Sequence, residues 1–249
     1  MQPDPSPSSE TSPFVYADTG PERAGIAAIS ARLAGGVIGI IGAGGTGSVV
    51  LDLIAKTPVD RIVLIDGDVM EAHNAFRAPG AARAEVIAER PFKVEYLRGV
   101  YSAMHRCIDA HATHLTAQNF HLLDDLDFAF LCLDSARARG AIVPEFDLRD
   151  LPFIDCGVGL EVANDSLTGM IRVTSSVPSN RSYDARIPQI GADEVELYRS
   201  NIQVADLNTL AATLAVIQYK QMRQFYADSG GEGHMIYRLE DNAMLNAAS

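Results

Sequence analysis

The chain has 249 residues, of which 47% are hydrophobic, and a formal net charge of −12. This length allows one large buried core or two small ones, and the composition is that of a globular protein. The negative charge argues against nucleic acid as the main partner, because phosphate binding needs a basic surface. No apolar run approaches the length of a membrane span, so no membrane association is expected.

Two further features predict a cytoplasmic protein, and the organisation of the chain predicts one domain. The N-terminus lacks the charged and apolar regions of a signal peptide, and the three cysteines follow no pattern, which fits a reducing cytoplasm. Residues 1–13 are rich in Pro and Ser and are predicted to form a disordered tail. The remainder has no internal repeat, so a single domain is predicted over residues 14–249.

The first predicted elements are a helix over Pro21–Ala34 and, after it, a strand–turn–helix–strand unit. An apolar strand ending at Ile41 runs into the turn Gly42-Ala43-Gly44-Gly45-Thr46-Gly47, and a second apolar strand, Arg61–Ile65, ends on Asp66. This is the plan of a nucleotide-binding βαβ unit: glycines let backbone amides approach phosphate, and the helix N-terminus presents unpaired N–H groups to an anion. The Asp66 carboxylate is placed to accept hydrogen bonds from ribose hydroxyls.

Polar and cationic side chains follow the second strand at short spacing. They are Asp68, Asn74, Arg77 and Lys93. Together they suit a triphosphate better than a nicotinamide, because a guanidinium binds phosphate through two N–H groups and a lysine supplies a movable point charge.

A later apolar run, Phe128–Leu133, is typical of a buried strand, and it ends on Asp134. In an open α/β sheet, the carboxyl ends of the strands line the ligand crevice. Asp134 is therefore placed to hold Mg²⁺, a hard cation that favours carboxylate and phosphate oxygens.

The rest of the chain continues the alternation of helices and strands. The polar stretch over residues 175–198 is long for a connector, and long connectors are usually functional or mobile; we call it the crossover segment. The apolar face of the last helix is predicted to comprise Leu207, Leu210, Leu214, Ile217 and Met222. The predicted helices are Ser48–Ala55, Phe92–Tyr101, Arg137–Phe146 and Asn201–Tyr226; the predicted strands are Thr113–Thr116, Pro152–Cys156, a hairpin over Leu160–Thr174 and an edge strand at Met235–Leu239.

The order of these motifs is specific. GxGGTGS, DxDVxxxxNxxR, a lysine and an aspartate at a strand end together resemble the superfamily of ThiF, MoeB and the ubiquitin-activating enzymes, over roughly residues 23–226. The resemblance implies a Rossmann-like α/β fold with a mixed central sheet flanked by helices. It also implies that the protein uses ATP to adenylate the C-terminal carboxylate of a ubiquitin-like or sulfur-carrier protein ending in glycine. A homodimer and a conjugating-enzyme-like acceptor are further expectations.

The resemblance also implies a role for each motif residue. Asp134 would hold Mg²⁺, and Arg139 matches an arginine in the helix that follows it. Arg23 matches the arginine that reaches across a dimer to the partner's ATP. The catalytic residues would be Arg77, Lys93, Asp134 and Arg23, and the ATP-binding residues Gly42, Gly44, Gly45, Thr46, Gly47, Asp66, Asp68, Asn74, Arg77 and Lys93.

This chain departs from the family pattern at several points. Ala78 follows the motif arginine where the family usually has Gln, and Ser135 follows Asp134 where it usually has Asn. There is no pair of CxxC motifs, so the structural zinc of many relatives is not expected. The crossover segment has no cysteine, so the acyl group would pass to a cysteine or hydroxyl on a partner, or to a serine of the segment itself.

Three other functions stay open at this point. An NAD-dependent oxidoreductase would share the glycine spacing but leaves Asn74, Arg77, Lys93 and Asp134 unexplained. A non-catalytic scaffold for a ubiquitin-like protein would not need the full set of polar residues. Adenylation of a short peptide would use the same residues as adenylation of a folded protein.

Overall fold

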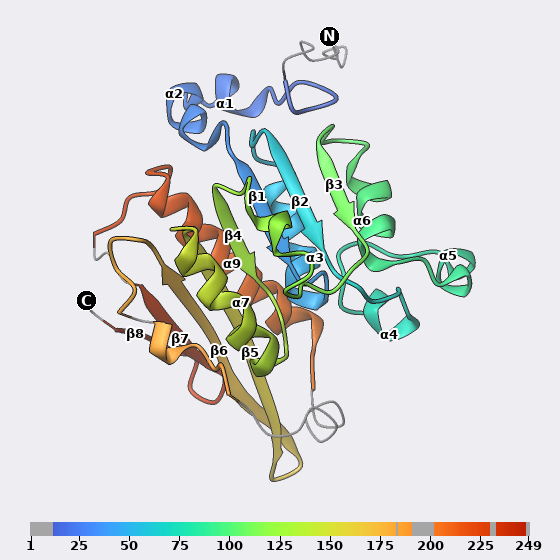
Figure 1. Cartoon of the computed structure of the whole chain (residues 1–249), viewed down its shortest axis with the longest axis vertical. Coiled ribbons are helices and arrows are strands. Elements are labelled where there is room, and N and C mark those ends of the chain that lie inside the picture. The colour runs from blue at the N-terminus through green and yellow to red at the C-terminus, as the bar shows by residue number, and fades with distance from the viewer. Residues whose placement is uncertain (1–11, 183, 191–201, 230–232, 248–249) are drawn as a thin grey trace.

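A central sheet of eight strands runs through the protein, of which the computed structural model describes residues 12–182, 184–190, 202–229 and 233–247 (Figure 1). The strands are β1 (Val37–Ile41), β2 (Arg61–Ile65), β3 (Ile108–His111), β4 (Phe128–Leu131), β5 (Phe153–Ala163), β6 (Ser166–Ser176), β7 (His234–Arg238) and β8 (Ala243–Ala247). Their order is β3-β2-β1-β4-β5-β6-β7-β8. The pairs from β3 to β5 are parallel and those from β5 to β8 antiparallel, which confirms the predicted mixed sheet.

Helices cover both faces of this sheet. They are α1 (Gly20–Arg23), α2 (Ala27–Ser30), α3 (Gly45–Ile54), α4 (Ala72–Ala75), α5 (Ala84–Glu89), α6 (Lys93–Tyr101), α7 (Ala136–Leu148) and α9 (Ala205–Met222), with the short 3-10 turns η1 (Ala31–Leu33), η2 (Phe120–Leu123) and η3 (Asp184–Arg186). Apolar side chains of α3, α6 and α9 pack against one face, and those of α7 pack against the other. Figure 1 shows α7 in front of the sheet and α3 and α9 behind it.

The central strands are apolar along nearly their whole length because both of their faces are covered, and β2 alone of β1, β2 and β4 begins with a charged residue, Arg61. In β1, Ile40 packs in the cluster with α3 and Ile41 in the cluster with α7. In β2, Leu64 and Ile65 divide in the same way. The continuous apolar runs of the sequence therefore correspond to a buried parallel sheet, and they leave only the strand ends for polar side chains.

The carboxyl ends of β1, β2 and β4 meet at one edge of the sheet, because these strands are parallel and in register. The start of α3 follows β1, Asp66 follows β2, and Asp134 with the start of α7 follows β4. This edge collects the residues that the sequence assigns to a nucleotide.

Two predicted elements in the first half of the chain are wrong in detail. The helix predicted over Pro21–Ala34 is broken into α1, α2 and η1, because Gly25 adopts a φ of +71° between the first two. The strand predicted at Thr113–Thr116 is instead β3, just before it. Residues 113–116 form an irregular loop held by Asn119, whose side chain accepts from the Thr116 N–H and donates to the His114 carbonyl.

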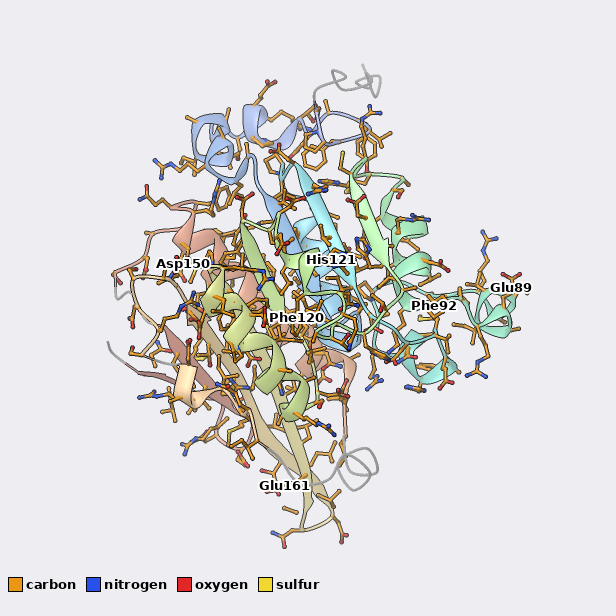
Figure 2. All side chains as sticks on the ribbon, viewed as in Figure 1. Glu89, Phe92, Phe120, His121, Asp150 and Glu161 are labelled. Carbon is orange, nitrogen blue, oxygen red and sulfur yellow. The ribbon has the colours of Figure 1, made fainter. Side chains whose placement is uncertain are left out.

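The antiparallel half of the sheet is larger than predicted. The predicted strand Pro152–Cys156 and the first arm of the hairpin form one long strand, β5, which turns into β6 at Asn164 and Asp165. Both turn residues have positive φ, of 49° and 59°, as a tight hairpin requires. The hairpin extends beyond the rest of the sheet, with Glu161 near its end (Figure 2). β7 matches the strand predicted at Met235–Leu239 but is not an edge, since β8 pairs with it.

The last long helix is confirmed, but its predicted buried face is wrong in part. Leu207 is buried, whereas Ile217 and Met222 are exposed. The buried face instead carries small residues, Ala211 and Ala215 among them, because α9 packs closely against α3 and the sheet.

Parts of two other predictions lie outside the described residues. These are residues 1–11 of the predicted tail and residues 183 and 191–198 of the crossover segment. Within the tail, the Pro13 carbonyl accepts a hydrogen bond from the Arg106 N–H at 2.7 Å.

Among the helices described, none is both long and apolar enough to cross a membrane.

Candidate nucleotide site

The turn between β1 and α3 needs glycine at two positions. Gly42 has a φ of +93°, and a Cβ on it would lie 2.5 Å from the carbonyl oxygen of Cys132 after β4. A Cβ on Gly47 would lie 1.8 Å from the carbonyl oxygen of Gly42, because the first turn of α3 packs directly on the end of β1. Only glycine allows both close approaches.

The N-terminus of α3 is open on one side. Around Gly44, no described heavy atom lies within 4 Å of the position that a Cβ would occupy. Gly44 is also the N-cap residue, so no side chain caps the first N–H groups of the helix there. Free N–H groups and the helix dipole together make such an end suitable for a phosphate.

Asp66 holds this turn to the end of β2. Its Oδ2 accepts from the Ala43 N–H at 2.7 Å, and its Oδ1 accepts from the Asp68 N–H at 2.8 Å. Burial raises the pKa of the Asp66 carboxyl, while Lys93 and the two backbone N–H groups oppose that shift. Each carboxylate oxygen has a second lone pair, so Asp66 can support the turn and still accept from a ribose hydroxyl.

Lys93 joins the carboxylates at this edge. It is the first residue of α6 and is only 7% exposed. Its Nζ donates to Asp68 Oδ2 at 2.7 Å and lies 4.0 Å from Asp66 Oδ1. The structure therefore brings together three of the predicted site residues, with a cation between two anions.

Arg77 lies beside the glycine turn. Its Cβ is 3.4 Å from the position of a Cβ on Gly45, and its Nη1 donates to Gln203 Oε1 at 2.7 Å. Asn74 is buried and has a structural role, since its Oδ1 accepts from the Glu71 N–H and completes a capping box at α4.

Asp134 is exposed in the loop between β4, which ends at Leu131, and α7. The neighbouring loop residue Leu133 is fixed by Arg139, which donates to its carbonyl and to that of Cys156. Arg139 is 5% exposed and pairs with the fully buried Asp155 at 2.7 Å. Arg172 pairs with the same carboxylate, also at 2.7 Å.

Arg23 does not join the other predicted residues. It is exposed on α1, which precedes β1, and Figure 1 shows α1 at the opposite end of the sheet from the start of α3. One chain therefore does not bring Arg23 to its own nucleotide site.

Sequence reasoning did not assign several residues at this edge to the nucleotide site. His114 packs against Gly67 and lies 3.7 Å from Asp68 Oδ1. The sequence pattern predicts a strand over residues 113–116, where the structure has a loop after β3, so it did not predict His114 at this edge. Asn208, from α9, contacts the glycine turn, and the signal that could have found it is a polar residue on the buried face of an apolar helix. No sequence pattern indicated that Gln203 would lie at this edge.

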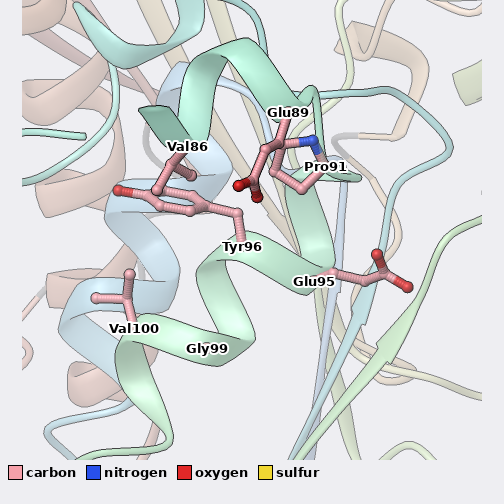
Figure 3. A pocket seen from close by; sticks show the side chains of 7 residues that line it. All are labelled: Val86, Glu89, Pro91, Glu95, Tyr96, Gly99 and Val100. Carbon is pink, nitrogen blue, oxygen red and sulfur yellow. The ribbon is translucent and has the colours of Figure 1, made fainter. Parts of the chain in front are cut away.

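The structure also has an open pocket of about 360 Å³ between α5 and α6 (Figure 3). Val86, Glu89, Glu95 and Tyr96 are among the residues that line it. None of the predicted site residues contributes to its walls, so it is separate from the nucleotide site.

A glycine turn at a helix N-terminus, with an acidic residue after the next parallel strand, defines the class of Rossmann-like nucleotide-binding proteins. The ThiF family model matches residues 27–217, and the chain belongs to the ThiF family. A search of curated proteins found no match.

Solved structures share the fold. PaaA is 19% identical, with a TM-score of 0.71 over 100% of this chain and 77% of that one. Escherichia coli MccB in complex with MccA-N7isoASN is 17% identical, with a TM-score of 0.69 over 88% of this chain and 66% of MccB. MccB from the same organism with ATP is 17% identical, with a TM-score of 0.65 over 88% of this chain and 65% of MccB. The chain thus spans just under two thirds of the MccB chains it matches.

Proposed function

We propose that this chain is an ATP-dependent adenylyltransferase that activates the C-terminal carboxylate of a ubiquitin-like or sulfur-carrier protein. The observation that carries the proposal is the shared edge of the sheet. The open N-terminus of α3 lies there with Arg77 beside it, and Lys93 lies near Asp66 at the end of β2. Anion-binding N–H groups and two cations suit a triphosphate better than the pyrophosphate of a nicotinamide dinucleotide, which carries less negative charge.

The chemistry requires positioning and charge neutralisation. ATP would lie along the glycine turn with its ribose at Asp66. An oxygen of the substrate carboxylate would form a bond to the α-phosphorus, and the bond from that phosphorus to the pyrophosphate oxygen would break. The carboxylate is already ionised at neutral pH, so no general base is needed. Arg77 and Lys93 would bind phosphate oxygens and stabilise the charge of the leaving pyrophosphate.

The expected Mg²⁺ fits the donors present. Magnesium is usually held by one or two carboxylates together with substrate phosphates, and it keeps several waters. The described residues contain no group of three side chains that could cage a metal, but Asp134 offers one exposed carboxylate at the right edge. Asp134 would hold the ion, which when bound supplies neutralisation of phosphate charge.

The second candidate substrate is a short peptide. The MccB neighbour, a microcin C7 biosynthetic enzyme, has been solved in complex with N-formylated MccA. This observation supports a substrate other than a ubiquitin-like protein as the second candidate. Both candidates present a C-terminal carboxylate to the same residues, so the experiment must distinguish them by the substrate supplied.

The partner contacts follow from the same proposal. A homodimer would bring the exposed Arg23 of one protomer to the nucleotide of its partner. The acyl group would pass to a conjugating-enzyme-like partner, because the crossover segment has no cysteine. We place this reaction in the cytoplasm.

The test is ATP–pyrophosphate exchange with purified protein, Mg²⁺ and candidate carriers ending in glycine. We expect exchange that requires both a carrier and its free terminal carboxylate. Carriers with an amidated C-terminus are the matched controls. Exchange with short peptides alone would identify the second candidate. ATP binding without exchange on any substrate would favour a scaffold, and preference for NAD over ATP would overturn the proposal.

A further inference from the structure

The start of α9 contacts both phosphate-binding elements of the proposed site. Gln203, two residues before the helix begins, accepts a hydrogen bond from Arg77 Nη1 at 2.7 Å. Asn208, in the first turn of the helix, accepts from the Thr46 Oγ1 hydroxyl at 3.2 Å. These contacts join segments 126 and 162 residues apart in the chain.

Asn208 fits closely against the glycine turn. It is 1% exposed, and a Cβ on Gly45 would lie 2.1 Å from its Nδ2. Asn208 therefore occupies the space that a side chain at position 45 would need. Within the described part of the chain, Nδ2 has no hydrogen-bond acceptor, and a buried polar donor without a partner is costly. A core residue selected only for packing would avoid that cost.

Gln203 contacts Arg77 through a neutral group. An arginine side chain has many rotamers, and fixing it before the ligand binds reduces the entropy lost on binding. A carboxylate at position 203 would fix the guanidinium at least as well, since charged hydrogen bonds are stronger. It would also offset the positive charge of Arg77, which the neutral amide of Gln203 does not.

We propose that Gln203 and Asn208 are positioning residues of the nucleotide site. Gln203 orients Arg77 toward the β- and γ-phosphates without neutralising it, and Asn208 fixes the glycine turn through Thr46. The inference rests on the proposed function for the identity of the nucleotide. It assigns the start of α9, which the sequence motifs do not include, to ATP binding.

The discriminating variant is Gln203→Glu. The half-buried contact with Arg77 is kept or strengthened, so the thermal midpoint stays within about 2 °C of the native value. Because the charge of Arg77 is neutralised, the Kd for ATP rises at least about tenfold, equivalent to about 1.4 kcal/mol. The Kd for AMP, which has no β- or γ-phosphate, changes less than about twofold, well under that same 1.4 kcal/mol. Isothermal titration calorimetry measures both.

Gln221→Glu is the matched control. Gln221 lies near the other end of the same helix, so the variant has the same change in net charge at a distance from the site. It is expected to bind ATP and AMP as the native protein does. An equal change in ATP and AMP affinity in Gln203→Glu, or no change in either, would overturn the role of Gln203.

The role of Asn208 is tested with Asn208→Ala and, should that variant fold poorly, Asn208→Ser. Every nucleotide with an α-phosphate contacts the glycine turn, so ATP and AMP should both bind about 3- to 10-fold more weakly, while adenosine binding is unchanged. Equal weakening of adenosine would mean that Asn208 supports the fold only.

The two proposals fail in different ways. Native protein that binds ATP, with selective loss of ATP in Gln203→Glu but no pyrophosphate exchange on any substrate, would retain the positioning role and overturn adenylation. Native protein that exchanges pyrophosphate, with unchanged ATP binding in Gln203→Glu, would do the reverse.

Discussion

At the scale of single residues, several predicted site residues lie near the glycine turn, but some of them bind backbone groups. The Asp66 carboxylate accepts from two N–H groups, and the Asn74 side chain caps α4. Sequence motifs report residue type and spacing, so they located these residues at the sheet edge. They could not show which hydrogen bonds maintain the loops, because those depend on how β1, β2 and α4 pack.

Arg77 and Asp134 test the proposed chemistry directly. We expect Arg77→Ala and Asp134→Ala each to lower the rate of adenylation at least about 100-fold, or about 2.7 kcal/mol in transition-state stabilisation. Arg77 contacts the glycine turn and Asp134 is the carboxylate assigned to Mg²⁺. ATP–pyrophosphate exchange measures the effect, and Arg61→Ala, which alters exposed ion pairs at the other end of β2, is the control. Exchange within about threefold of native, under 1 kcal/mol, would remove the residue from the mechanism.

The buried carboxyl of Asp66 should leave a signature in the pH dependence of stability. Its pKa in the folded protein is raised by burial, so the folded state binds this proton more tightly than the unfolded state does. The contribution of Asp66 to the free energy of unfolding is therefore most favourable below the unfolded pKa and declines as pH rises through the folded pKa. The measurement is the difference between native protein and Asp66→Asn in urea unfolding, at several pH values in that window. The free energy of unfolding of the native protein minus that of Asp66→Asn should fall as pH rises. A rise in this quantity with pH would contradict the raised pKa.

At the scale of elements, the strands were easier to predict than the faces of the helices. Apart from Arg61 at the start of β2, the strands β1, β2 and β4 are apolar because both their faces are covered, and that pattern is visible in the sequence. The buried face of α9 was not visible in the sequence, because alanines such as Ala211 and Ala215 are buried while the larger Ile217 is exposed. Close packing between helices selects small residues, and hydrophobicity alone does not identify such a face.

The start of α7 shows an element fixed by a buried ion pair. Arg139 pairs with Asp155 and donates to the Leu133 carbonyl next to Asp134. We expect Arg139→Leu to lower the free energy of unfolding by about 3 kcal/mol, the lower end of the range for breaking a buried pair, because Arg172 still pairs with Asp155. Urea unfolding measures it.

Arg149, at the end of the same helix, is the matched control for Arg139. It also pairs with carboxylates, at 2.9 Å and 2.6 Å, but its side chain is 25% exposed. Arg149→Leu should cost no more than about 1 kcal/mol. Similar losses in the two variants would mean that the Arg139 pair stabilises α7 no more than a surface contact does.

At the scale of the whole molecule, the sequence predicted the fold class, and it placed the candidate site at an edge of the sheet where the structure brings Asp66, Asp68 and Lys93 together. It did not predict β8 or the contact of α9 with the glycine turn. The local motifs lie within one βαβ unit, whereas Asn208 reaches Thr46 across 162 residues. Contacts at such separations depend on how the complete chain folds, and no local pattern records them.

The position of Arg23 makes the assembly testable. It is exposed on α1, at the opposite end of the sheet from the start of α3, so it can act in catalysis only in a partner's site. Arg23→Ala and Arg77→Ala should each be inactive alone. When the two variants are mixed and allowed to exchange subunits, each heterodimer has one site with an intact Arg77 and the partner's intact Arg23. Random pairing makes half of the dimers mixed, and two-fold symmetry gives each of those one intact site of two, so about a quarter of native activity should return. Recovery on mixing, followed by pyrophosphate exchange, would establish action across a dimer, while full activity of Arg23→Ala alone, or of a monomer in light scattering, would exclude it.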